Sequence, residues 1–344
     1  MNINLTRRSF IATQAAAAGL ALSACGGAGG AGGAGEASDG ANASLTKITF
    51  CLDYTPNTNH TGIYVAQDQG FFADEGIEVE IVQPAEDTAE AMIGTGQAQL
   101  GVSYQDYLAN SFVGGNTGLQ AVAAIIQHNT SGIMSPKELG VTSAKGMEGL
   151  RYATWDLPVE QATVKQVVEK DGGDYSKVQL VPYTVDDEIS GFKADLFDTV
   201  WVYEGWAVQN AAVQDYPVNY FSFISIDDVF DYYTPVIAAN TDFCKKNPDV
   251  VKAFLRAAKK GYEFAIADPD AAADILCAAV PELDPALVKQ SSAFLAGEYQ
   301  SDAASWGIIE ADRWAAFFQW LNDNKLVEKP LDVNAGWTMD YLEA

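Results

Sequence analysis

The chain has 344 residues, of which 48% are apolar, and its formal net charge at pH 7 is -26. This negative charge repels phosphate and excludes nucleic acid as a partner, whereas the apolar content is ample for two lobes with separate cores. The acidity itself favours solubility and does not indicate a ligand.

The first residues are typical of an export signal rather than of a folded domain. Two arginines precede an uncharged stretch rich in alanine and leucine, and Leu-Ser-Ala-Cys follows it. Residues 6–11 resemble a twin-arginine signal, and residues 22–25 resemble a lipobox, whose cysteine becomes the lipidated first residue of the mature protein. A transmembrane anchor is the alternative, but the apolar stretch is shorter than the roughly 18 residues that a span needs. We therefore expect residues 1–24 to be removed and Cys25 to carry a lipid.

Residues 25–46 are mostly glycine, alanine and small polar residues. They lack the large apolar side chains of a core, so we expect a flexible tether. No later stretch is apolar enough to cross a bilayer. The sequence thus predicts an exported protein that a lipid alone holds at the outer face of the cytoplasmic membrane.

The remaining cysteines are Cys51, Cys244 and Cys277. An odd number without CxxC spacing fits neither a disulfide framework nor a zinc site, so we expect buried thiols and no bound metal.

Short apolar runs alternate with helical patterns in the first part of the body. We expect strands at 48–52, 78–82, 100–103 and 119–127, with helices at 62–72, 88–94 and 105–112. This order is typical of a parallel sheet covered by helices.

A second unit of the same kind follows. We expect strands at 151–154, 178–181 and 199–203, helices at 159–170 and 186–193, and extended runs at 220–228 and 232–240. Beyond these runs the pattern predicts helices at 247–267, 270–279, 285–299 and 310–324. Because no further sheet is expected for these helices to cover, we place them on the first lobe.

The predicted fold class is therefore α/β with two lobes. Residues 47–130 and 236–344 form lobe 1, and residues 131–235 form lobe 2. Two crossovers, near residues 128–136 and 222–238, join the lobes as a hinge.

Five polar and aromatic loops follow predicted strands: DYTPNTNH, SYQD, HNTSG, WDLPVE and WVYEGW. In open α/β sheets ligands bind beyond the carboxyl ends of the strands, so these loops are expected to converge on one cleft. The candidate ligand-binding residues are Asp53, Tyr54, Asn57, His60, Tyr104, Gln105, Asn129, Ser131, Trp155, Glu160, Trp201, Tyr203 and Glu204.

The chemistry of these loops suits a flat, uncharged or weakly basic ring. Aromatic side chains can sandwich the ring, and short polar side chains supply paired donors and acceptors. Cations are nearly absent, so a phosphate would find little compensation. Asp53, Glu160 and Glu204 are candidates to accept from an exocyclic amine, with solvated surface acids as the alternative. For His60 and His128 a bracing or hydrogen-bonding role is favoured over catalysis, because no nucleophile signature accompanies them.

Four stretches of the chain carry a family resemblance. They are residues 48–84, which contain DYTPNTNHTG, residues 94–106 (GTGQAQLGVSYQD), residues 125–133 (IIQHNTSGI) and residues 232–276. Together they resemble the NMT1/THI5-like solute-binding proteins of ABC importers, whose members include carriers of thiamine pyrimidine precursors. The resemblance implies a two-lobed periplasmic-binding-protein fold of type II, no cofactor, and docking of a monomer to a permease with its ATPase.

The same superfamily contains eukaryotic enzymes that make the hydroxymethylpyrimidine phosphate of thiamine from pyridoxal phosphate and a histidine of their own chain. On that resemblance Ser103 stands in place of their Schiff-base lysine and Tyr107 in place of their histidine. The cysteine-rich iron-binding motif of the enzymes is also missing. These departures favour a binding protein over an enzyme.

The resemblance implies capture of hydroxymethylpyrimidine or formylaminopyrimidine by closure of the two lobes. Many relatives have tryptophan at the position of Tyr54, and often a glycine-rich loop where this chain has TWDLPVE at 154–160. Riboflavin and other nitrogenous solutes therefore remain alternative ligands. An extracellular sensor and a pyrimidine-synthase-like enzyme are the alternative classes of function.

Overall fold

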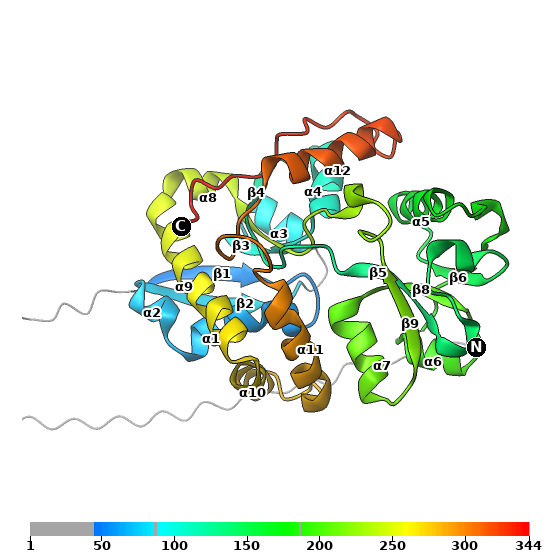
Figure 1. Ribbon diagram of the computed structural model, residues 1–344. Helices are drawn as coiled ribbons and strands as arrows, with labels where there is room; N and C mark the ends of the chain where they lie inside the picture. The colour runs from blue at the N-terminus through cyan, green and yellow to red at the C-terminus, as the bar shows by residue number, and fades with distance from the viewer. Residues whose placement is uncertain (1–44, 85–87, 186, 344) are drawn as a thin grey trace, which may run out of the picture. The chain divides into compact units, whose positions relative to one another are not determined.

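The computed structural model describes residues 45–84, 88–185 and 187–343, all of which belong to one compact unit. The predicted export signal, the predicted lipidation site Cys25 and most of the predicted tether lie outside these residues. Two sheets of five strands each form the framework, and Figure 1 shows them with helices on their faces. We call the parts built around the two sheets the first lobe and the second lobe.

The first sheet has the strand order β2-β1-β3-β10-β4, and the second has the order β7-β6-β8-β5-β9. The strands of the first sheet are β1 (Thr46–Cys51), β2 (Ile77–Val82), β3 (Leu100–Ser103), β4 (Leu119–Ala124) and β10 (Val236–Asn240). Those of the second sheet are β5 (Ser131–Pro136), β6 (Arg151–Thr154), β7 (Gln179–Pro182), β8 (Thr199–Tyr203) and β9 (Val218–Ser222).

Both sheets are mixed, so the prediction of a parallel sheet holds for only part of each sheet. β10 runs antiparallel to β3 and β4, and β5 runs antiparallel to β8 and β9, whereas β1 and β6 pair with parallel neighbours. A parallel neighbour requires a long return crossover, usually through a helix. β5 and β10 instead enter their sheets directly from the other lobe. They need no return crossover within their own sheet, so they can run antiparallel to their neighbours.

The predicted crossover at 128–136 contains a strand that the sequence pattern did not reveal. β5 lies between β8 and β9 in the second sheet and is buried along its whole length. Its sequence SGIMSP begins with Ser-Gly and ends with Pro, which are turn formers, so the strand signal is weak. The segments that join the lobes are therefore 125–130 and 223–235.

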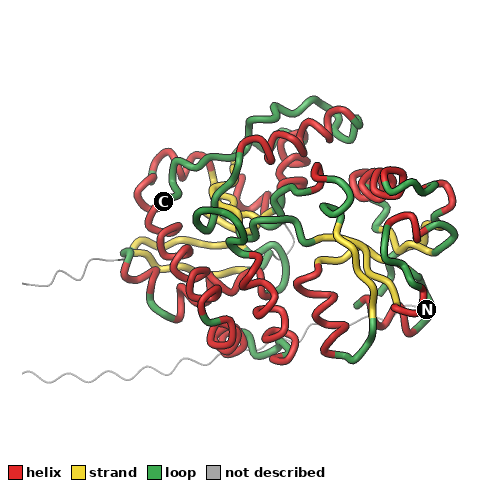
Figure 2. The backbone as a smooth tube through the Cα atoms, viewed as in Figure 1, coloured by secondary structure: helices red, strands yellow, loops and turns green. Residues whose placement is uncertain are grey.

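The helices of the first lobe are α1 (Thr61–Asp68), α2 (Phe71–Asp74), α3 (Ala89–Thr95), α4 (Gln105–Val113), α8 (Thr241–Lys246), α9 (Pro248–Ala267) and α10 (Pro269–Ala279). Figure 2 shows these helices flanking the strands of the first sheet. α9 crosses α1 so closely that a Cβ atom added at Gly62 would lie 2.4 Å from the ring of Tyr262. Only glycine permits this approach, which places α9 directly behind the loop that follows β1.

The second lobe carries α5 (Pro158–Lys170), α6 (Glu188–Lys193) and α7 (Gln209–Val213). The last two helices, α11 (Pro285–Glu298) and α12 (Ala311–Asp323), contact this lobe as well as the first. Ser291 on α11 donates its hydroxyl to the carbonyl of Gly205, and Trp320 on α12 donates Nε1–H to Gln166 Oε1 at 2.6 Å. The predicted position of the carboxyl-terminal helices on the first lobe alone is therefore incomplete.

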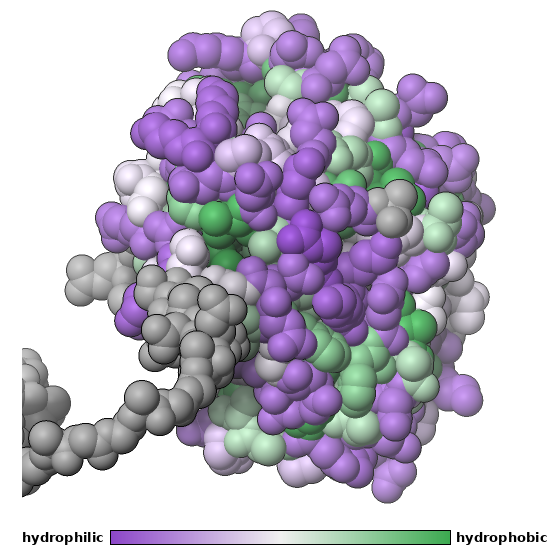
Figure 3. Space-filling model, turned by 90° about the vertical axis from the view of Figure 1, so that its left-hand side faces the viewer, coloured by the Kyte–Doolittle hydropathy of each residue, from purple (hydrophilic) through white to green (hydrophobic). Residues whose placement is uncertain are grey.

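The surface agrees with the acidic composition. Hydrophilic residues cover most of the face in Figure 3, and apolar side chains show there only in small separate areas. Along the described ranges, no helix combines the length and the apolar character that crossing a membrane requires.

Candidate functional site

Two neighbouring cavities open where strands of both sheets end. The polar cavity, of about 430 Å³, is lined by residues 53–59, Tyr104, Thr130, Asp187, Glu188, Tyr203, Trp206, Asn210 and Thr234, among others. The aromatic cavity, of about 600 Å³, is lined mainly by Tyr104, Asp106, Tyr107, Trp155, Leu157, Glu160, Trp201, Tyr203 and Tyr232. Tyr104 and Tyr203 line both, so the two cavities meet at these rings.

The loop after β1 is shaped by its own side chains. Asn57 caps a short 3₁₀ turn (Thr58–His60), because its Oδ1 accepts the backbone N–H of Asn59 at 2.9 Å. The backbone N–H of Asn57 in turn donates to His60 Nδ1 at 3.1 Å, which completes a reciprocal cap. His60 is fully buried and lines neither cavity, so its contacts match the bracing interpretation.

Asp53 joins this loop to the end of β3. Its Oδ1 lies 2.6 Å from His60 Nε2, and its Oδ2 accepts the phenol of Tyr104. Burial opposes ionisation of Asp53, but the hydrogen bonds from His60 and Tyr104 outweigh it and hold the pKa of this carboxyl below its usual value. Burial and the Asp53 charge raise the pKa of Tyr104 well above its usual value, so its phenol stays a donor.

Helices from the carboxyl-terminal part hold the same loop from behind. Tyr262 on α9 donates its phenol to the carbonyl of Asn59 at 2.8 Å, and Tyr299, at the end of α11, donates to the carbonyl of Thr58 at 2.6 Å. Both tyrosines are fully buried. The loop is therefore fixed before a ligand arrives, which lowers the ordering cost of binding.

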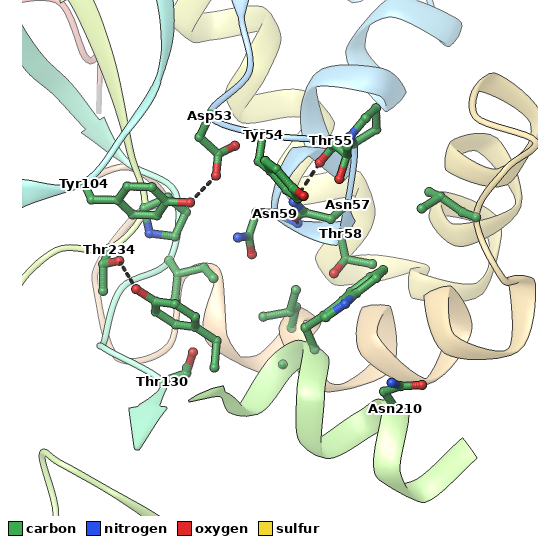
Figure 4. A pocket seen from close by; sticks show the side chains of 18 of the residues that line it. Asp53, Tyr54, Thr55, Asn57, Thr58, Asn59, Tyr104, Thr130, Asn210 and Thr234 are labelled. Atoms are coloured by element: carbon green, nitrogen blue, oxygen red, sulfur yellow. Dashed lines mark hydrogen bonds between the residues drawn. The ribbon is translucent and has the colours of Figure 1, made fainter. Parts of the chain in front are cut away.

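Asn59 and Tyr54 present their side chains to the polar cavity. The Asn59 amide has no hydrogen-bond partner among the described side chains and backbone groups, and in Figure 4 it lies between Tyr104 and Thr58. Tyr54 is 72% exposed, so one face of its ring is free for stacking. Asn59 is not among the residues predicted from the sequence, although it stands in the same motif as Asn57.

The second lobe supplies the opposite wall of the polar cavity. Residues 204–208 form a π-helical turn after β8, and this turn brings Trp206 to the cavity, whereas Glu204 lines neither cavity. Asn210 on α7 and Glu188 on α6 complete the wall. Burial raises the pKa of the Glu188 carboxyl. Asn210 and Glu188 are not among the residues predicted from the sequence, because the predicted site residues come mainly from the loops that follow strands.

The aromatic cavity is built around Trp155. Its ring lies 6.1 Å from the ring of Trp201, measured between centroids, and 42% of its residue surface is exposed. Glu160 fixes the loop that carries Trp155, since its carboxylate accepts the backbone N–H of Trp155 at 3.1 Å and that of Leu157 at 3.3 Å. Burial raises the pKa of Asp106, on the rim of this cavity, to about 6.

The structure brings eight of the thirteen predicted site residues to the cavities. Asp53, Tyr54, Asn57, Tyr104 and Tyr203 line the polar cavity, and Trp155, Glu160 and Trp201, again with Tyr104 and Tyr203, line the aromatic cavity. His60, Gln105, Asn129, Ser131 and Glu204 line neither. Contact of any of these residues with a ligand stays a prediction.

Two of the residues outside the cavities hold the segments that join the lobes. Gln105 donates to the carbonyl of Trp314 at 2.8 Å and accepts the backbone N–H of Tyr233 at 3.0 Å. Asn129 donates to the carbonyl of Phe230 at 2.8 Å, and its Oδ1 accepts the backbone N–H of Ser131 at 2.8 Å. Their buried amides are therefore used inside the protein.

A charged cluster ties the two joining segments together. His128 Nδ1 lies 2.7 Å from Asp231 Oδ2, and His128 Nε2 lies 2.9 Å from Asp302 Oδ1. Arg313 donates to the carbonyl of Gln127 at 2.6 Å. Burial opposes protonation of His128, but the hydrogen bonds to the two aspartates outweigh it and raise the pKa of this imidazole.

The two cavities lack positive charge. No lysine, arginine or histidine occurs among the described residues that line them. Nor do the described ranges contain a group of three or more histidine, cysteine, aspartate or glutamate side chains placed to hold a metal ion. The lining therefore offers aromatic faces, amides and carboxyl groups, which suit a flat ligand with N–H donors.

The arrangement of two α/β lobes around these cavities defines a class of protein. The structure is similar to the periplasmic aliphatic sulphonate binding protein SsuA from Escherichia coli, with a TM-score of 0.69 and 13% identity, over 87% of this chain and 100% of that chain. The predicted periplasmic-binding-protein fold is thereby confirmed. The NMT1/THI5 like family model matches residues 57–272, and the chain belongs to this family.

Relatives of this chain include both binding proteins and enzymes. The formylaminopyrimidine-binding protein of Halalkalibacterium halodurans is 28% identical over 297 residues, which cover 84% of this chain and 88% of that protein. The 4-amino-5-hydroxymethyl-2-methylpyrimidine phosphate synthase THI11 of Saccharomyces cerevisiae is 26% identical over 238 residues, which cover 66% of this chain and 69% of the enzyme.

Proposed function

We propose that this chain is the solute-binding protein of an ABC importer and captures a free, unphosphorylated thiamine pyrimidine precursor of the formylamino or hydroxymethyl type. The observation that carries the proposal is the lining of the two cavities, whose described residues combine aromatic rings and carboxyl groups from both lobes and include no cation. The similarity to a formylaminopyrimidine-binding protein supports the same ligand class.

Recognition follows from the chemistry of such a ring. A flat aminopyrimidine can stack on aromatic side chains of either cavity, such as Tyr54 in the polar cavity or Trp155 in the aromatic cavity, and each ring pair contributes about 1 kcal/mol beyond the area it buries. The Asn59 amide offers both a donor and an acceptor to the ring edge. A phosphate ester would place two negative charges beside Asp53 and Glu188, and the described lining residues offer no compensating cation, so we expect it to be rejected.

Closure of the lobes converts binding into a signal for transport. Lobe 1 (47–130 and 236–344) and lobe 2 (131–235) move about the two joining segments, and a ligand that contacts both lobes stabilises the closed form over the open form. The permease, with its ATPase, recognises the closed form. Export and a lipid on Cys25 keep this monomeric protein beside the permease, outside the cytoplasmic membrane.

One alternative to this proposal is a different ligand, and another is a different class of function. Riboflavin or another nitrogenous solute would use the same stacking faces, and the 600 Å³ aromatic cavity gives a larger ring system room. A pyrimidine-synthase-like enzyme would need a Schiff-base lysine where Ser103 stands. Ser103 is fully buried and donates to Glu90 Oε1 at 2.6 Å, so its hydroxyl has a structural use.

A thermal-shift screen tests the proposal, because a ligand that binds only the folded state raises the melting temperature. The compounds are hydroxymethylpyrimidine, its phosphate, formylaminopyrimidine, thiamine, riboflavin and pyridoxal. We expect the two unphosphorylated pyrimidines to raise the melting temperature and the phosphate to leave it unchanged. A shift with riboflavin alone, or with the phosphate at least as large as with the free pyrimidine, contradicts the proposal.

A further inference from the structure

Three carboxyl groups, those of Asp53, Asp187 and Glu188, occur among the described residues that line the polar cavity, and their hydrogen bonding differs. Both oxygens of Asp53 accept hydrogen bonds, one with His60 and one from Tyr104. Asp187 is also engaged at both oxygens, because they accept the backbone N–H and the hydroxyl of Ser190 at the start of α6. Every carboxylate oxygen of Asp53 and Asp187 therefore already accepts a hydrogen bond from the protein.

Glu188 is the carboxyl group with acceptor capacity to spare. Its donors are its own backbone N–H and the phenol of Tyr183, and the contact with Tyr183 is long, at 3.4 Å. Burial removes solvent from the Glu188 carboxyl and raises its pKa, against the hydrogen bonds that lower it. A poorly solvated acceptor gains more from a new donor than a well-solvated one does.

The position of Glu188 also matters for closure. It lies on α6 of the second lobe, whereas Asn59 lines the same cavity from the loop after β1 in the first lobe. A ligand that engages both side chains is held from the two lobes at once. The remaining candidates for the amine acceptor do not offer this, because Glu160 is committed to the backbone of its own loop and Glu204 lies outside the cavity.

We propose that Glu188 is the specificity-determining residue that accepts a hydrogen bond from the exocyclic amine of the ligand, and thereby selects amino-substituted rings over their oxo counterparts. The inference rests on the proposed function. A carboxylate only accepts, so an amine donates to it, whereas an oxo group would set two acceptors against each other in a partly dry site. A site built for a donor rejects the analogue that lacks it far more strongly than an apolar pocket does.

Calorimetric titration with two probes tests this assignment. The probes are 4-amino-5-hydroxymethyl-2-methylpyrimidine and its 4-oxo counterpart, each titrated at pH 7.5 into the wild type, Glu188→Gln, Glu188→Asp and Glu263→Gln. Glu263 is an exposed acid on α9 that lines neither cavity, so its variant makes the same chemical change away from the site. Melting curves establish that each variant folds.

We expect the wild type and Glu263→Gln to prefer the amino probe by about fiftyfold or more. Glu188→Gln should reduce the preference below about fivefold, because the new amide binds the amino probe less well and donates to the oxo probe. Glu188→Asp keeps the charge at a shorter reach and should retain an intermediate preference. An unchanged preference in Glu188→Gln overturns the assignment and leaves the proposed function standing. An equal loss of affinity for both probes in the two Glu188 variants does the same. A wild type that binds neither probe overturns both.

Discussion

The backbone N–H of Asn59 donates to the side-chain Oδ1 of Asn57 at 2.9 Å, and this bond gives two asparagines of one motif different roles. The side-chain amide of Asn57 bonds to the loop itself, since its Nδ2 also donates to the carbonyl of Thr55 at 3.1 Å. Asn59 is positioned by its backbone, through Asn57 on one side and Tyr262 on the other. Its side chain is thereby left for the polar cavity.

Replacing each asparagine by alanine should separate these roles. We expect Asn59→Ala to weaken binding of the free pyrimidine about tenfold, which corresponds to about 1.4 kcal/mol, with little change in melting temperature. Asn57→Ala removes a helix cap and should lower the free energy of unfolding by about 1 kcal/mol. Calorimetry and urea unfolding of both variants measure the two effects. A loss of stability without a loss of affinity in Asn59→Ala would show that Asn59 is structural.

Trp155 should contribute to binding through its exposed ring face. We expect Trp155→Ala to weaken ligand binding at least tenfold, because it removes a stacking surface of the aromatic cavity. Trp155→Phe keeps an aromatic face and should remain within about threefold of the wild type. An unchanged calorimetric affinity of the alanine variant would remove Trp155 from the site.

Asp53 should stabilise the fold in a pH-dependent way. Its pKa is lower in the folded protein than in the unfolded chain, so its contribution is present above the unfolded pKa and is lost as the pH falls through the folded pKa. We expect Asp53→Asn to cost about 2 kcal/mol at pH 7, the usual scale for hydrogen bonds to a charged group. The difference from the wild type in urea unfolding should shrink below about pH 4. A difference that is constant from pH 7 to pH 3 would exclude a role for the charge.

His128 should act in the opposite direction. Its pKa is raised on folding, so its stabilising contribution is present below the unfolded pKa of about 6.5 and is lost as the pH rises through the folded pKa. Asp231 and Asp302 contact the imidazole, and Glu298 and Arg313 also act on it electrostatically. The melting-temperature gap between the wild type and His128→Asn should therefore be larger at pH 6 than at pH 9. A gap that widens with rising pH would contradict this account.

Gly62→Ala tests whether α9 fixes the site loop. The added methyl group would overlap the Tyr262 ring at 2.4 Å, so we expect a destabilisation of about 3 kcal/mol and weaker ligand binding. Gly297→Ala is a matched control on α11, because nothing lies within 4 Å of its added Cβ atom. It should be neutral or slightly stabilising, since alanine favours a helix. Equal stabilities of the two variants in urea unfolding would contradict the close crossing.

Regular elements with clear boundaries could be predicted from the sequence. The strands at 100–103, 151–154 and 199–203 have the predicted bounds, because each is an apolar run between polar or turn-forming residues. β5 could not be predicted in this way. Its Ser-Gly start and Pro end favour a turn locally, and burial between β8 and β9 outweighs that preference, which only the tertiary structure provides.

The location of the site could be predicted better than the use of each side chain. The rule that ligands bind at the carboxyl ends of strands predicts the loops after β1, β3 and β8, and these loops line the cavities. It did not distinguish Asn57 from Asn59, because that difference depends on which amide caps the turn. The aromatic neighbours of Glu204 favour it as a ligand-binding residue, yet the π-helical turn places Trp206, and not Glu204, at the cavity.

The most direct test of capture without conversion is calorimetric titration of the wild type with formylaminopyrimidine, followed by chromatography of the recovered ligand. The account predicts saturable binding with one ligand per chain, micromolar affinity or better, and recovery of the pyrimidine unchanged after prolonged incubation. No heat of binding, or the appearance of a new pyrimidine product, would contradict it.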